Sequence, residues 1–329
     1  MCYPHSMIEK ESRTVTDIRT HRLIYGCMGL GGGWDRQPYG PAEIDAAEAA
    51  IVAALEVGVT AFDHADIYRH GKSEAVFGEV LARTPGLRER ILLQTKCGIH
   101  LPDGDRPGYY DLRGTHIRHS VEQSLTRLRT DVIDVLLLHR PDPLADPEDV
   151  AETLTALHRE GLVRYFGVSN MAAAQIAYLQ AHLDLPLIVN QLQMSLADRD
   201  WLEAGVLVNT PPAATLGFPL GTVERGLLDR VGVQAWGPLA RGRFTGAAQT
   251  PAEHATTAHV AALAEQHDTT PETILLWWLQ RHPARIVPVI GTSRPERIRA
   301  CADAVRREPD LTHEQWYELW LTARGEALP

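Results

Sequence analysis

The chain has 329 residues, and its 42 acidic side chains outnumber the 32 Lys and Arg to give a formal charge of −10. Nucleic-acid binding is not expected, because neutralising phosphates requires a broad basic face. With 44% hydrophobic and 22% charged residues, the composition is typical of a soluble globular protein with a substantial core, and neither disorder nor a collagen-like structure fits it.

The amino-terminal segment and the cysteines give no sign of export. Residues 1–12 contain no apolar run long enough for a secretory signal peptide, and we expect them to be disordered. The four cysteines lie far apart, without the paired spacing of a zinc site or a dithiol redox site, which is typical of a reducing compartment. We therefore expect a cytoplasmic protein without a metal site.

One uncharged stretch, residues 204–223, needs testing as a membrane span. It contains Pro211, Pro212 and Pro219, which would break a helix. The stretch therefore predicts a long surface loop, and no association with a membrane is expected.

Short runs rich in Val, Ile and Leu recur along the chain, each ending at or next to a glycine or a polar residue. In chain order they span residues 23–29, 58–63, 91–96, 133–139, 163–169, 187–191, 231–236 and 286–290. Strands that are apolar along their whole length are expected where both faces of a sheet are covered, as in parallel sheets.

Helical patterns lie between these runs. Apolar residues spaced by three and four predict helices with one buried face, in the sets Ile44, Ala47, Ile51, Leu55 and Ile117, Val121, Leu125, Leu128. Asp146 followed by Pro147 predicts an N-cap and a first helical turn, and Gly161 predicts the end of that helix.

Eight such units, with no Ser/Gly-rich linker and no change in composition, predict a single (β/α)8 TIM barrel domain over residues 1–329 rather than a doubly wound sheet. Residues 14–26 are compatible with a short β-hairpin that closes the barrel floor. Residues 98–114, 197–222 and 237–250 are too long for simple connections, and long loops in compact folds are often functional.

The residues that end the runs point to chemistry, because the active site of such a barrel lies at the carboxyl ends of its strands. Core packing would favour Val, Ile or Leu there, yet the runs end in Asp63, Lys96, His139, Ser169, Gln191 and Trp236. Tyr68 follows on the loop after Asp63. We expect these side chains to share one face of the barrel.

Seven segments in this order resemble the aldo-keto reductases, most closely the bacterial oxidoreductase branch of that superfamily. They are GVTAFDHADIY, LLQTKCG, LLLHRPDPL, GVSN, NQLQ, AWGPLARG and PVIGTSRPERI, within residues 22–305. Each is weak evidence alone, whereas seven in order at matching strand ends form a specific pattern.

The resemblance implies an NADP-dependent reductase of aldehydes or ketones, in which Tyr68 donates the proton, Lys96 and Asp63 tune it, and His139 orients the carbonyl. Hydride delivery builds negative charge on the carbonyl oxygen, which must be protonated or stabilised. An ammonium about 4 Å from the phenolic oxygen favours phenolate by roughly 4 kcal/mol at an effective dielectric near 20. We therefore expect Lys96 to lower the pKa of Tyr68, while Asp63 offsets part of this effect and keeps Lys96 protonated.

For the cofactor, the resemblance implies that Ser169, Asn170 and Gln191 hold the nicotinamide carboxamide and that Trp236 stacks on the ring. Gly31 and Gly32 lack the spacing of a Rossmann fingerprint, and we interpret them as a close backbone approach beside the cofactor. Further cofactor contacts are implied at Gly237, Pro238, Leu239, Arg243, Gly291, Thr292 and Ser293.

At the adenosine end, Arg294 and Arg297 surround a predicted helix start at Pro295. Guanidinium groups together with backbone N–H groups at a helix start suit a 2′-phosphate, so NADP is favoured over NAD. The substrate is expected to be a small carbonyl compound or alcohol in a pocket with aromatic walls, for which the candidates are Trp34, Tyr109, Tyr110 and Phe218.

Two alternatives stay open at this point. One is a nicotinamide-binding regulatory subunit with incidental turnover, and the presence of all four residues, Asp63, Tyr68, Lys96 and His139, argues against a purely regulatory role. A Schiff-base aldolase using Lys96 would need a lysine of lowered pKa, away from a paired acid. The expected Asp63 partner argues against the aldolase.

Overall fold

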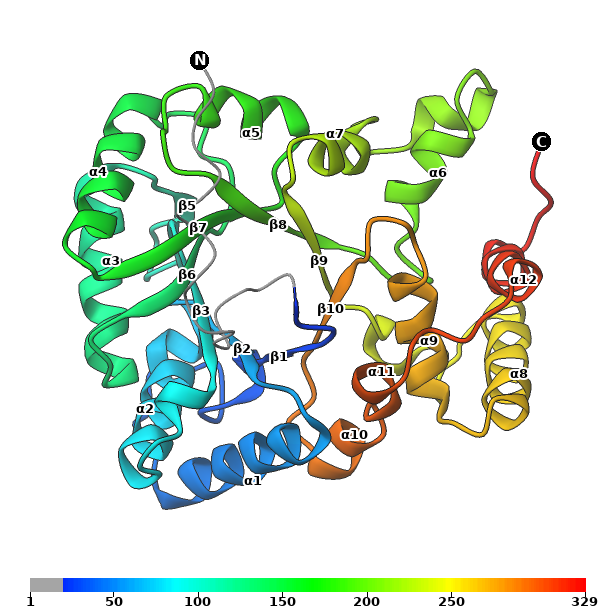
Figure 1. Ribbon diagram of the computed structural model, residues 1–329, viewed down its shortest axis with the longest axis horizontal. Coiled ribbons are helices and arrows are strands. Elements are labelled where there is room, and N and C mark those ends of the chain that lie inside the picture. Colours follow the sequence, from blue (N-terminus) through cyan, green and yellow to red (C-terminus); the bar gives the residue numbers. More distant parts are fainter. Residues whose placement is uncertain (1–19) are drawn as a thin grey trace, which may run out of the picture.

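A computed structural model describes residues 20–329 and contains a closed barrel of eight parallel strands (Figure 1). The strands are β1 (Ile24–Gly26), β2 (Ala61–Asp63), β3 (Leu92–Cys97), β6 (Ile133–Leu138), β7 (Val163–Ser169), β8 (Leu187–Gln193), β9 (Gly232–Trp236) and β10 (Val287–Ile290). Each pairs with the next in this order, and β10 closes on β1. The barrel and the positions of its strands confirm the prediction; the predicted disorder at 1–12 and the first part of the predicted hairpin lie outside the described residues.

Helices surround the barrel on its outside (Figure 1). The first five follow successive strands: α1 (Pro41–Val57), α2 (Lys72–Arg83), α3 (Gly114–Leu128), α4 (Pro147–Arg159) and α5 (Ala173–Gln180). The others are α6 (Asp200–Val206), α7 (Thr222–Leu228), α8 (Pro251–Gln266), α9 (Pro271–Gln280), α10 (Pro295–Arg299), α11 (Asp303–Arg306) and α12 (His313–Arg324). The last helix, α12, packs against α8.

Local sequence signals set the helix boundaries. The Asp146 side chain accepts a hydrogen bond from the Glu148 N–H, Pro147 occupies the first turn, and Gly161 follows the helix with φ 75°. These are the N-cap, first-turn proline and carboxyl-terminal glycine predicted for α4.

Most strand residues are buried, as expected where both faces of a parallel barrel are covered. All six residues of β6 are buried. The interior holds an apolar layer of Ile24, Ala61, Leu92, Val135, Leu137, Val189 and Val289. Above this layer the interior side chains become polar, and that change positions the site.

Two of the three long connections contain structure that the sequence analysis did not predict. Residues 98–114 include a two-stranded antiparallel hairpin, β4 (Ile99–His100) with β5 (Tyr109–Tyr110). Two-residue strands are too short to give a periodic signal.

The stretch at 204–223 is not a loop throughout, and that prediction was wrong at both ends. Helix α6 extends to Val206 because Trp201 and Ala204, three residues apart, are buried in the core. Only from Pro211 do the prolines limit the chain to a 3-10 turn. Among residues 20–329, no helix has the length and apolar character needed to cross a bilayer.

Candidate active site

Strand alternation brings the first two candidate residues together. Side chains two apart on a strand share one face, so Leu92, Gln94 and Lys96 of β3 point into the barrel. Asp63 ends the neighbouring strand β2, in register with Gln94. The Lys96 ammonium lies 2.6 Å from an Asp63 carboxylate oxygen, and both side chains are buried.

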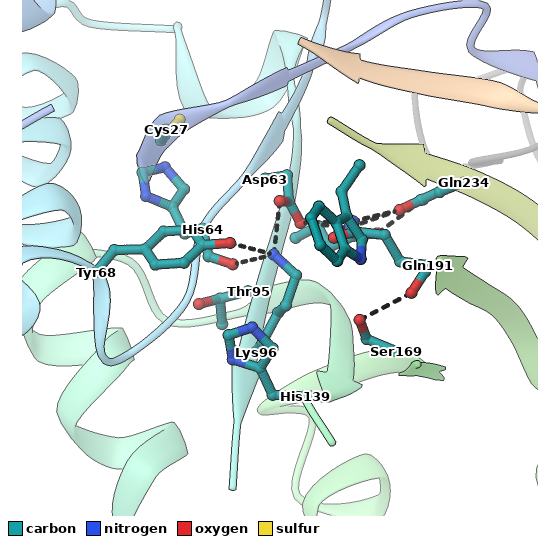
Figure 2. Close-up of polar contacts among 12 residues, drawn as sticks. Cys27, Asp63, His64, Tyr68, Thr95, Lys96, His139, Ser169, Gln191 and Gln234 are labelled. Carbon is teal, nitrogen blue, oxygen red and sulfur yellow. Dashed lines mark hydrogen bonds and ion pairs between the residues drawn. The ribbon is translucent and has the colours of Figure 1, made fainter. Parts of the chain in front are cut away.

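Lys96 also binds Tyr68 (Figure 2). Its Nζ lies 3.1 Å from the Tyr68 hydroxyl oxygen and donates to the His64 carbonyl at 2.9 Å. An ammonium has three N–H donors, and Asp63, His64 and Tyr68 accept all three. The Tyr68 oxygen therefore acts as an acceptor toward Lys96, and its own proton is left to point elsewhere.

A sharp turn places Tyr68. It begins a 3-10 turn, Tyr68–Gly71, in which Arg69 and His70 have left-handed φ values of 53° and 58°. Left-handed residues other than glycine are uncommon and cluster at functional sites. The turn returns the tyrosine ring to the barrel mouth, where its centroid lies 5.0 Å from Lys96 Nζ.

The direction of the Tyr68 pKa shift was predicted incorrectly. Burial raises the pKa of the Tyr68 phenol above its ordinary value, and the attraction of the Lys96 ammonium only partly opposes this. Burial also disfavours the Lys96 ammonium, but Asp63 and Tyr68 more than offset that cost, so the pKa of Lys96 is raised. Lys96 does lie beside the phenol and lowers its pKa, as predicted, but the prediction did not include the larger effect of burial. Tyr68 is thus a neutral phenol at neutral pH.

His139 follows the end of β6 and lies beside Tyr68, with ring centroids 6.0 Å apart. Burial, together with the Lys96 ammonium and the Arg140 guanidinium, holds the pKa of His139 well below its ordinary value. The imidazole is therefore neutral at pH 7 and keeps one N–H donor.

Three glutamines lie beneath Asp63; Gln191 was predicted as a cofactor contact, whereas Gln94 and Gln234 were not predicted. The Gln94 and Gln191 side-chain amides donate to Asp63 at 2.6 and 3.2 Å, and both also donate to the Gln234 side-chain oxygen. Figure 2 shows Gln191 and Gln234 beside Asp63. All three are buried. The mid-strand positions of Gln94 and Gln234 gave no signal beyond a polar residue within an apolar run. The Gln94 and Gln191 amides donate to one oxygen of the buried Asp63 carboxylate, and Lys96 donates to the other, so neither oxygen lacks a hydrogen-bond partner.

A cavity of about 590 Å³ opens above this group. Of the predicted residues it is lined by Asp63, Tyr68, His139, Ser169, Asn170, Gln191, Trp236, Gly237, Pro238, Leu239, Gly291, Thr292 and Arg297. Tyr68 and His139 thus face the same space as the predicted cofactor residues. Lys96 lies behind Tyr68, outside the cavity wall.

Hydrogen bonds fix one wall of the cavity. The Trp236 indole N–H donates to the Asn170 side-chain oxygen at 3.0 Å, and the Asn170 amide donates to the Ser169 hydroxyl at 2.8 Å. Ser169 in turn donates to the Gln191 carbonyl at 2.9 Å. The indole is therefore held in one orientation.

Comparison with known proteins bears on the whole barrel. The sequence model of the aldo/keto reductase family matches residues 22–319. The chain belongs to this family. It is 37% identical over 317 residues to the uncharacterized oxidoreductase YcsN of Bacillus subtilis, covering 95% of this chain and 97% of the relative. It is also 37% identical over 314 residues to a 6-dehydroglucose reductase of Agrobacterium fabrum, covering 94% and 96%.

Solved structures agree on the fold of this aldo/keto reductase. A glycerol dehydrogenase from Gluconobacter oxydans has a TM-score of 0.75 at 23% identity, over 94% of both chains. An aldo/keto reductase from Klebsiella pneumoniae, solved with NADP and acetate, has a TM-score of 0.67 at 24% identity, over 91% of this chain and 89% of that one. The family match and the two relatives at 37% identity identify the protein as an oxidoreductase of the aldo/keto reductase family.

Several predicted contacts of the reductase lie away from the cavity. Arg243 pairs with Glu253 at 3.3 Å and Arg294 with Glu296 at 3.5 Å, and neither arginine lines the cavity. Ser293 also lies outside its walls. Of the two arginines expected near a phosphate, only Arg297 reaches the cavity.

Gly31 and Gly32, predicted to approach the cofactor, instead approach neighbouring parts of the chain. Both have positive φ, and a Cβ at Gly31 would lie 2.8 Å from the Lys72 backbone. A Cβ at Gly32 would lie 3.2 Å from Glu43. Neither lines the cavity, so the close approach is to the chain itself rather than toward the cavity.

Some wall residues were missed. Met28, Arg140 and Arg241 line the cavity, as does Trp34, which was predicted. Arg140 follows His139 directly, so its position at a strand end was a signal that could have found it. Of the other predicted aromatic residues, Tyr109 and Tyr110 line neither this cavity nor the next one described.

A second cavity of about 550 Å³ adjoins the first and shares Arg140 and Asn170 with it. Its other walls include the side chains of Gln175, Gln193, Asp198, Asp200, Trp201 and Phe218. Carboxylates and amides beside aromatic rings suit a polar molecule that carries several hydroxyl groups.

Proposed function

We propose that this reductase converts an aldehyde or ketone to the alcohol, reversibly, with NADPH as the hydride source and Tyr68 as the proton donor. The observation that carries the proposal is the chain of contacts from Asp63 through Lys96 to Tyr68 at the wall of the larger cavity. The Lys96 ammonium can only donate, and it donates to the Tyr68 oxygen. The Tyr68 proton is therefore not used in this contact and is free for a substrate oxygen.

The other residues have roles that follow from their positions. A neutral His139 beside Tyr68 donates a hydrogen bond to the carbonyl oxygen and fixes its approach. As the proton leaves Tyr68, negative charge appears on the phenolic oxygen, 3.1 Å from the Lys96 ammonium. Asp63 and the glutamines beneath it hold that ammonium in place.

The cavity fits a nicotinamide dinucleotide. A Cβ at Gly237 or Gly291 would meet no atom within 4 Å, so both glycines leave open space beside the walls. The fixed Trp236 indole supplies a flat apolar surface for a ring. When bound, the reduced nicotinamide supplies the hydride. The Arg297 guanidinium supports a preference for NADPH, since it lines the cavity and suits a phosphate.

Neither alternative is favoured. A Schiff-base lysine needs a lowered pKa, whereas Asp63 and Tyr68 outweigh the effect of burial and raise the pKa of Lys96. A regulatory role without turnover would not require a tyrosine hydroxyl at the cavity wall beside a buried lysine.

We further propose a polyhydroxylated carbonyl substrate. The second cavity extends the first past Arg140 and is lined by amides, carboxylates and aromatic rings. A relative at 37% identity is a 6-dehydroglucose reductase, which has a sugar-derived substrate in its name. NADPH consumption with 6-dehydroglucose should therefore exceed that with benzaldehyde in kcat/KM, and the reverse order would contradict the substrate class.

Replacing Tyr68 by Phe tests the proton donor. We expect kcat to fall by about 10²- to 10⁴-fold, the usual contribution of a general acid. NADPH binding, measured by quenching of tryptophan fluorescence, should persist. Tyr25→Phe is the matched control, because the Tyr25 hydroxyl is buried without a hydrogen-bond partner. Near wild-type turnover in the Tyr68 variant would show that another group donates the proton.

A further inference from the structure

Three side chains of metal-ligating type converge beside the β4–β5 hairpin, outside both cavities. His100 belongs to β4, Asp111 directly follows β5, and His116 lies in the first turn of α3. One potential ligand atom from each lies within 4.8 Å of the other two. Neither their position nor their chemistry is used by the proposed reaction.

The spacing of the group is close to that of a metal site. Two ligands bound at 2.0–2.1 Å to a tetrahedral ion lie about 3.4 Å apart. The His100 Nε2 and an Asp111 carboxylate oxygen are 3.1 Å apart, so this pair needs almost no rearrangement. The ligand atoms lie within 4.8 Å of one another, so the His116 nitrogen has to approach by at most about 1.4 Å, and a rotation of its half-buried ring brings it closer.

The surrounding structure holds two of the ligands in place. The Asp111 side chain is only 3% exposed, and it accepts the Arg113 backbone N–H at 3.1 Å. The His100 ring stacks on Tyr109, with ring centroids 4.3 Å apart, and the His116 ring lies tilted 4.2 Å away. A histidine held by stacking on a neighbouring ring loses less conformational freedom when it binds an ion.

One interaction competes with a metal ion. Arg113 binds both oxygens of Asp111, at 2.9 and 2.6 Å. The Arg113 side chain is 69% exposed, so solvent screens this pair. An ion placed between His100 and Asp111 replaces a hydrogen bond of His100, while Asp111 keeps Arg113 as an outer partner.

We propose that His100, Asp111 and His116 form a binding site for a divalent transition-metal ion, with water at the fourth position. Two imidazoles and one carboxylate are a ligand set that suits Zn²⁺, Co²⁺ and Ni²⁺ rather than Mg²⁺ or Ca²⁺. The hairpin begins directly after β3, which carries Lys96, and the Leu112 N–H donates to Asp142 in the loop after His139 at 2.9 Å. An ion here fastens the hairpin to α3 beside the mouth of the barrel.

The test uses the full chain without an affinity tag, stripped of metal by a chelator and dialysed. Co²⁺ is titrated while its visible absorption is followed, and Zn²⁺ binding is measured by calorimetry. We expect one equivalent of each ion per chain, and a higher unfolding temperature with Zn²⁺ because binding to the folded state stabilises it.

His116→Ala should weaken Zn²⁺ binding at least 100-fold, and Asp111→Asn should remove the four-coordinate Co²⁺ spectrum. His119→Ala is the control, since this exposed histidine lies on the same helix. Unchanged binding in His116→Ala, or equal losses in His116→Ala and His119→Ala, would overturn the site, as would no binding by the wild type. Thermal unfolding of each metal-free variant shows that it is folded before the titration is interpreted.

Discussion

Replacing Lys96 by Met removes the positive charge that lies 3.1 Å from the Tyr68 oxygen. At 3.1 Å and an effective dielectric near 20, an ammonium stabilises a full phenolate by about 5 kcal/mol. If about half of the charge has formed in the transition state, the loss is about 2.5 kcal/mol, or roughly 100-fold in kcat/KM. Because the overall equilibrium is unchanged, the reverse oxidation must lose the same factor at a given pH.

The pH dependence separates this electrostatic role from simple misplacement. Burial already raises the pKa of Tyr68, and Lys96 is the main group that opposes the rise. Reduction declines as pH rises through this pKa, because a phenolate has no proton to donate. Without Lys96 the pKa rises further, so the alkaline limb of kcat/KM should move to higher pH.

The assay is NADPH absorbance at a series of pH values, with one carbonyl substrate. Lys72→Met is the matched control, since Lys72 also pairs with a carboxylate, at 2.9 Å from Asp35, but lies outside the cavity. Lys96→Met leaves Asp63 buried and unpaired, so the double variant with Asp63→Asn is needed if the single one does not fold. An alkaline limb at the wild-type pH in a folded variant would refute the electrostatic argument.

Three further outcomes follow from contacts elsewhere in the protein. Arg297→Ala should raise the KM for NADPH by about 10- to 100-fold, as expected for loss of a charge-assisted hydrogen bond. The KM for NADH should change little, and equal changes for both cofactors would argue against a phosphate contact. Gly167→Ala should lower the free energy of unfolding in urea by about 1–3 kcal/mol, because its Cβ would lie 2.5 Å from Val189, whereas Gly217→Ala meets nothing within 4 Å and serves as the control. Burial and Glu74 raise the pKa of Asp66 to about 7, so stability should decline as pH rises from about 4 to 7, and Asp66→Asn should flatten that decline in thermal unfolding.

The barrel and the grouping of Asp63, Lys96 and His139 at one face were predictable because both depend on short-range rules. Apolar runs and capping signals such as Asp146 give the order of strands and helices, and parallel strands bring their carboxyl ends to one face. Asp63, Lys96 and His139 needed only their positions at strand ends to be predicted as neighbours. The place of Tyr68 on the loop after Asp63 predicted the barrel face that it shares, but its role as proton donor came from the family resemblance, and no rule of spacing predicts the left-handed turn that places it.

The features that were not predicted depend on packing across the chain. Gln94, Gln191 and Gln234 come from three strands, and only the closed barrel shows that they meet beneath Asp63. Burial of Tyr68 likewise depends on tertiary packing. It raises the pKa of Tyr68, whereas the contact with Lys96 alone had predicted a lower pKa. The short hairpin is held by two antiparallel residue pairs, which leave no periodic pattern in the sequence.

Burial of the phenol and the charge beside it have complementary effects on the proposed reaction. A neutral Tyr68 keeps its proton until a carbonyl oxygen begins to gain charge, because burial disfavours the free phenolate. Lys96 then stabilises the phenolate as the proton leaves, and it stays charged because Asp63 and Tyr68 raise its pKa. The fixed charges of Asp63 and Lys96 cancel before the reaction begins, so the site holds a neutral donor that becomes an anion beside a preformed cation.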